Sequence, residues 1–114
     1  MRSRWILGAG LLLLASSRAF ATTVAGALIM DGAKSVDTDR YKMAKDWDDV
    51  MRFYRRAYAS KDGYSWRFHA DTPKVKLWHV ENLRKKREWD GLNIYETPDG
   101  VFVFILRSAT ANGS

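Results

Sequence analysis

The chain has 114 residues, no cysteine and a formal net charge of +6 at pH 7. A chain of this length forms one domain, and without disulfides its fold must be stabilised by packing alone. The sequence lacks a phosphate-binding glycine-rich loop, a Gly-x-Ser-x-Gly motif and a Cys or His-x-x-x-His metal spacing. These absences exclude the enzyme and binding classes that such motifs define.

The first 21 residues have the pattern of a secretory signal peptide. A basic start and an apolar stretch, residues 5–15, precede the cleavage sequence Ala19-Phe20-Ala21. Because the apolar stretch is shorter than the about 20 residues that cross a bilayer, cleavage is favoured over a membrane anchor. The sequence therefore predicts that residues 1–21 are removed and that the mature protein is periplasmic or extracellular.

The mature chain begins with small and apolar residues, 22–30, which fit either the end of the export region or a short first strand. A strand is predicted over residues 39–44 and a helix over residues 46–59. Apolar residues at spacings of three, four and seven give this helix one apolar stripe. Asp46 is its predicted N-cap and Gly63 its predicted stop signal.

Strands are predicted after the helix over residues 64–70 and 75–83, followed by a hairpin over residues 88–107. The hairpin turns at Thr97-Pro98-Asp99-Gly100, where proline and glycine suit the two corners of a turn. Its second arm, residues 101–106, is apolar throughout, which predicts a central strand covered on both faces. Before the turn, Gly91 interrupts the alternation and predicts a bulge.

The predicted fold is α+β. It consists of a single, mostly antiparallel sheet of four to five strands with one helix packed on one face, in the order β-α-β-β-β-β. We expect the apolar stripe of the helix to bury against one face of the strand that follows it, Tyr64, Trp66 and Phe68. The domain is expected to span residues 22–107, and residues 108–114 are expected to form a disordered tail.

Several segments resemble small exported bacterial α+β domains of unknown function. They are Gly32-Ala33-Lys34 ahead of a strand with Tyr41, the helical segment that ends Phe53-Tyr54-Arg55-Arg56, and the segment from Trp89 to Glu96. The resemblance covers roughly residues 31–107 and implies an envelope or secreted location and the fold described above. It supplies no catalytic residue.

The two histidines are candidates for a site on the sheet. His69 and His79 lie on neighbouring predicted strands, with Glu81 nearby. A histidine pair with a carboxylate can bind a metal ion or carry out acid–base catalysis. A metal site needs a third or fourth ligand, which no spacing in the sequence supplies, so two half-exposed structural histidines are the favoured interpretation.

The densest charge in the chain is the basic run Arg84, Lys85, Lys86 and Arg87, beside aromatic residues. Such a run can bind phosphate, anionic lipid or nucleic acid. The expected export argues against nucleic acid, and a loop that keeps a hairpin soluble is the simpler interpretation.

We therefore expect an exported, non-enzymatic domain without a cofactor. It would bind or scaffold an envelope component, whether protein, glycan or anionic lipid, through the sheet face or the basic loop. One alternative is a small hydrolase or metal-dependent enzyme that uses His69 and His79, and another is a binder of anionic surfaces through residues 84–87.

Overall fold

The computed structural model describes residues 21–109. The predicted signal peptide, apart from Ala21, and residues 110–114 of the predicted tail lie outside the described residues. The elements in chain order are β1 (Ala21–Val24), β2 (Ala27–Met30), β3 (Lys34–Asp37), β4 (Arg40–Lys42), α2 (Trp47–Ala57), the 3₁₀ helix η1 (Ser60–Asp62), β5 (Tyr64–Asp71), β6 (Lys76–Asn82), β7 (Trp89–Thr97) and β8 (Gly100–Arg107).

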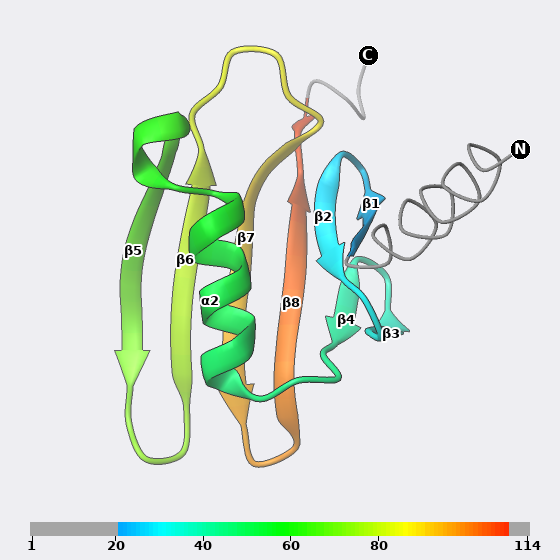
Figure 1. Cartoon of the computed structure of the whole chain (residues 1–114), viewed down its shortest axis with the longest axis vertical. Helices are drawn as coiled ribbons and strands as arrows, with labels where there is room; N and C mark the ends of the chain where they lie inside the picture. Colours follow the sequence, from blue (N-terminus) through cyan, green and yellow to red (C-terminus); the bar gives the residue numbers. More distant parts are fainter. Residues whose placement is uncertain (1–20, 110–114) are drawn as a thin grey trace, which may run out of the picture.

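Six strands form one antiparallel sheet in the order β3-β4-β8-β7-β6-β5, and β1 and β2 form a separate hairpin. Helix α2 lies across one face of the large sheet, and the β1–β2 hairpin lies beside the helix (Figure 1). The α+β class and the antiparallel pairing are confirmed. The predicted single sheet of four to five strands is wrong, because strands of three or four residues such as β1, β2 and β3 are too short to show a period.

Helix α2 has the N-cap and the apolar stripe that its sequence predicts, but not the predicted stop. Asp46 caps the first turn, where its side chain accepts a hydrogen bond from the Asp49 N–H at 3.0 Å. The buried positions Val50, Met51 and Tyr54 belong to the predicted stripe, whose other members are Trp47, Ala57 and Tyr58. The predicted stop at Gly63 is wrong for this helix: α2 ends at Ala57, and Gly63, with φ of +100°, ends η1 instead.

The closing hairpin of β7 and β8 is confirmed, with Thr97 paired to Gly100 across the turn. The predicted bulge is also present, because the register shifts between Trp89 and Gly91. Strand β8 is central, between β4 and β7. It is not covered on both faces, because its residues alternate between buried positions toward α2 and half-buried positions on the opposite face, Phe102, Phe104 and Leu106.

Aromatic side chains form the end of the core near the start of β7. Trp89 is 4% exposed, and its ring centroid lies 4.8 Å from that of Tyr58 and 5.9 Å from that of Tyr64. The predicted burial of the β5 face holds for Tyr64 and in part for Trp66, whereas Phe68 is 52% exposed. Phe68 contacts Trp78 on the helix side of the sheet, at the edge that β5 forms.

Two tyrosines of the helix segment fix the β1–β2 hairpin to the rest of the domain. The Tyr54 hydroxyl donates a hydrogen bond to the Leu28 carbonyl at 2.9 Å, and the Leu28 N–H donates one to the Tyr58 hydroxyl oxygen at 2.8 Å. Burial raises the pKa of both tyrosines, so both hydroxyls stay protonated at neutral pH. The hairpin is therefore an integral layer, and its Ala27 and Ile29 belong to the core.

The ordered chain extends past the predicted end of the domain at residue 107. Ser108 is buried, and its N–H donates a hydrogen bond to the Glu88 carbonyl at 2.9 Å.

Candidate functional site

The two histidines lie on the sheet face opposite α2. The ring centroids of His69 and His79 are 5.9 Å apart and the rings are nearly perpendicular. His79 Nδ1 lies 2.7 Å from Asn93 Oδ1, which favours the tautomer that carries the proton on Nδ1. Glu81 lies near the pair, but it accepts a hydrogen bond from Arg67 at 3.1 Å. The structure thus brings the three predicted residues to one face while the carboxylate forms an ion pair with Arg67.

This arrangement supplies little of what a metal centre or an acid–base site requires. Among residues 21–109, no group of three His, Cys, Asp or Glu side chains is placed to hold a metal ion. A structural or catalytic zinc ion takes three or four protein ligands. The His79 ring instead packs against the backbone of β7, since a Cβ atom added at Gly91 would lie 2.7 Å from its Cε1. The geometry therefore fits a structural role for His79.

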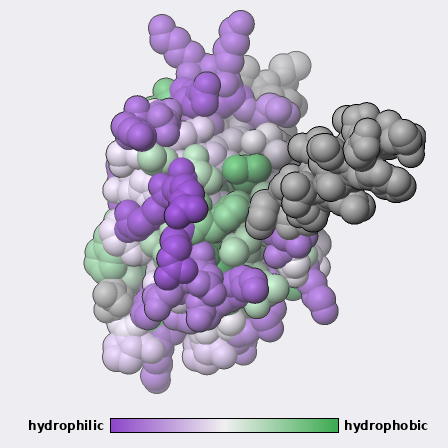
Figure 2. Space-filling model, in the orientation of Figure 1, coloured by the Kyte–Doolittle hydropathy of each residue, from purple (hydrophilic) through white to green (hydrophobic). Residues whose placement is uncertain are grey.

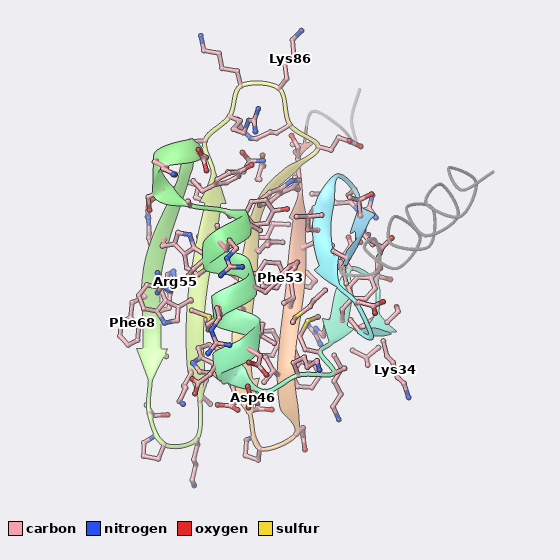
Figure 3. The ribbon with its side chains drawn as sticks, in the orientation of Figure 1. Lys34, Asp46, Phe53, Arg55, Phe68 and Lys86 are labelled. Carbon is pink, nitrogen blue, oxygen red and sulfur yellow. The ribbon has the colours of Figure 1, made fainter. Side chains whose placement is uncertain are left out.

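The basic run forms the loop between β6 and β7, but its four side chains are not equivalent. Arg87 donates hydrogen bonds to Asp90 Oδ1 at 2.8 Å and to the Arg84 carbonyl at 2.6 Å. The Arg84 side chain packs close to Gly63. Lys85 and Lys86 are exposed, and Lys86 extends into solvent at the end of the molecule (Figure 3). Arg87 is therefore held within the loop, whereas the Arg84 guanidinium and the two lysines form no ion pair with any other described residue.

A third candidate site, which the sequence did not predict, lies between α2 and the end of β2. We call it the α2–β2 groove. It has a volume of about 450 Å³ and is lined by Met30, Lys45, Asp49, Arg52, Phe53, Arg56 and Ala57. Apolar surface beside the helix is bordered by hydrophilic side chains in Figure 2, and Phe53 is directed toward this side of α2 in Figure 3. The groove thus combines an apolar floor with a charged rim.

The rim of the groove has an excess of positive charge. Asp49 is its one acidic residue, and Arg52 forms an ion pair with it at 2.7 Å. Lys45 and Arg56 form no ion pair with any other described residue. Because the exposed Asp49–Arg52 pair is close to neutral in sum, Lys45 and Arg56 set the sign of the local potential.

The three arginines of α2 have three different surroundings. Arg52 pairs with Asp49, and Arg56 faces the groove. The Arg55 guanidinium lies 4.5 Å from the ring centroid of Trp66 and 4.6 Å from that of Trp78. This double cation–π contact fixes Arg55 on the side of the helix away from the groove.

The class defined by the fold is a two-layer α+β domain with an antiparallel sheet and one covering helix layer. Comparison of the chain with protein-family models, curated proteins and solved structures gave no match. The family resemblance therefore stays a prediction that rests on the residues quoted for it. Within residues 21–109, no helix is long and apolar enough to cross a membrane.

Proposed function

We propose that the protein is a small exported, non-enzymatic domain that binds an anionic amphiphile in the α2–β2 groove. The observation that carries this proposal is the combination, in one groove of about 450 Å³, of apolar side chains with two cations, Lys45 and Arg56, that form no ion pair with any other described residue. Ligand sites of small molecules have this size and this mixture of apolar lining with a few charged groups.

The chemistry of the lining points to the class of ligand. Met30, Phe53 and Ala57 offer apolar surface for a hydrocarbon chain. Lys45 and Arg56 can bind a carboxylate or phosphate head group through charge-assisted hydrogen bonds, which are stronger than neutral ones. A fatty acid or a single-chain phospholipid has both parts, and either would be an envelope component of the kind that the sequence leads us to expect.

The binding test uses a dansyl-labelled fatty acid and the processed protein. We expect Lys45→Glu and Arg56→Glu each to weaken binding about tenfold, which corresponds to about 1.4 kcal/mol, because each replaces an attractive contact with repulsion. Fluorescence titration measures the affinity. The corresponding labelled alcohol should bind more weakly than the acid, since it lacks the charge that the rim recognises.

The matched control is the double variant Lys85→Glu/Lys86→Glu, which makes the same kind of charge change in the β6–β7 loop. Binding that falls equally in this variant would favour the anionic-surface alternative and contradict a site in the groove. Equal affinity for the acid and the alcohol would also contradict the proposed role of Lys45 and Arg56.

Export is part of this proposal and is supported by the basic, apolar and Ala-x-Ala pattern of residues 1–21. We expect the protein produced with its own leader in a bacterium to be recovered from the periplasm or medium with a mass that begins at Thr22. Recovery of an unprocessed cytoplasmic protein would contradict export, whereas the groove could still bind its ligand.

A further inference from the structure

A second pocket lies between the β6–β7 loop and the turn of the β1–β2 hairpin. We call it the loop pocket. It has a volume of about 420 Å³, and its lining includes the charged residues Arg84, Lys86 and Glu88 and the buried residues Tyr64, Asn82 and Trp89. The loop forms one end of the molecule, and the hairpin turn is directed toward the same end (Figure 1). Glu88 meets this turn, because its Oε1 lies 3.1 Å from the position that a Cβ atom of Gly26 would occupy.

Hydrogen bonds hold the backbone of the β6–β7 loop in place around this pocket. Asn82 is 4% exposed; its side chain donates a hydrogen bond to the Trp89 carbonyl at 3.0 Å and accepts one from the Arg84 N–H at 3.1 Å. The Arg87 side chain crosses the loop to the Arg84 carbonyl and is held by Asp90. Because these contacts fix the loop backbone, a ligand has to order only exposed side chains, which keeps the entropic cost of binding low.

The loop pocket holds charges of both signs that do not pair with one another. Arg84, Lys86 and Glu88 form no ion pair with any other described residue. Arg107 is near enough to Glu88 to interact electrostatically, but both of its hydrogen bonds, at 2.9 Å, go to Asp39. A ligand that carries both an anionic and a cationic group is therefore complementary to this pocket, whereas a simple anion meets repulsion from the carboxylate.

We propose that the loop pocket binds a phosphate group with a neighbouring ammonium, the chemistry of phosphoethanolamine. A guanidinium and an ammonium together suit a phosphate, whose several oxygens accept charge-assisted hydrogen bonds from both Arg84 and Lys86. Glu88 accepts a hydrogen bond from the ammonium of the ligand. The free phosphate ester and the head group of a phospholipid share this chemistry. This site is separate from the α2–β2 groove and does not depend on the function proposed for it.

The test is calorimetric titration with O-phosphoethanolamine and with inorganic phosphate. We expect O-phosphoethanolamine to bind about tenfold more tightly than phosphate, because only its ammonium can reach Glu88. Glu88→Gln should weaken O-phosphoethanolamine about tenfold and strengthen phosphate about twofold, since the carboxylate attracts the ammonium and repels the phosphate. Changes of opposite sign cannot come from a general loss of structure. Glycerophosphoethanolamine distinguishes the two sources: its binding assigns the lipid head group, and binding of the monoester alone assigns the free ester.

Two adjacent lysines of the loop provide a matched control. Both are exposed, but Lys86 lines the loop pocket and Lys85 does not. Lys86→Gln should weaken O-phosphoethanolamine about tenfold, and Lys85→Gln less than about twofold. Equal losses in the two variants would overturn the proposal in favour of diffuse attraction by the basic run. Equal affinity of the original protein for O-phosphoethanolamine and phosphate, or no binding of either below about 10 mM, would overturn it as well.

Discussion

Replacing Trp89 with alanine should lower the free energy of unfolding by about 3–5 kcal/mol. Trp89 is 4% exposed and packs against Tyr58 and Tyr64, so its removal leaves a cavity among three aromatic rings. This loss is a large share of the about 5–15 kcal/mol that stabilises a typical domain. Urea unfolding followed by far-ultraviolet circular dichroism measures the loss, because the tryptophan fluorescence itself changes with the substitution.

Trp47→Ala is the matched control, because it makes the same chemical change at a half-buried position. Helical spacing puts Trp47 on the apolar stripe, but it lies at the first residue of α2, and its ring centroid is 5.7 Å from the Lys76 ammonium. We expect this variant to lose less than half as much stability as Trp89→Ala. Equal losses would contradict the placement of the aromatic core at the start of β7.

The elements that could be predicted from the sequence are either long enough to show a helical period or contain residues specific to a turn. Eleven residues of α2 are enough for its stripe to be visible, and the β7–β8 turn has proline and glycine at the positions that its geometry requires. Strand β3 could not be found in this way, because its four residues are all exposed. The coverage of β8 was also unpredictable, since a run of apolar residues does not say whether the second face meets a layer or solvent.

The groove could not be predicted because its lining comes together only in the folded chain. Met30 ends β2 and Lys45 precedes α2, and the hydrogen bonds between Leu28 and two tyrosines bring these segments together. One signal was present in the sequence: Phe53 is a large apolar residue of the helix that lies outside the predicted stripe. The two histidines, in contrast, lie on one face of the sheet as expected. Alternation along a strand determines on which face of the sheet each side chain lies.

Gly91→Ala is expected to destabilise the protein by about 1–3 kcal/mol, through crowding at the back of the sheet. A Cβ atom at this position would lie 2.7 Å from His79 Cε1 and 2.9 Å from the Val80 carbonyl oxygen. The histidine ring can move away only by losing its contact with Asn93, and the carbonyl is fixed in the pairing of β6 with β7. Urea unfolding measures the loss, and the nitrogen chemical shifts of His79 report whether its ring has moved.

The double variant Gly91→Ala/His79→Ala separates the two sources of crowding. It removes the ring but keeps the carbonyl contact, so it should recover part of the stability lost in Gly91→Ala, whereas His79→Ala alone should cost less than Gly91→Ala. Full stability of Gly91→Ala would show that the backbone relaxes and would contradict the close approach. Partial recovery would mean that the ring of His79 fills the space left by the missing side chain of Gly91. This packing is a structural reason for a histidine at position 79. It therefore weakens the argument that His79 has a catalytic role.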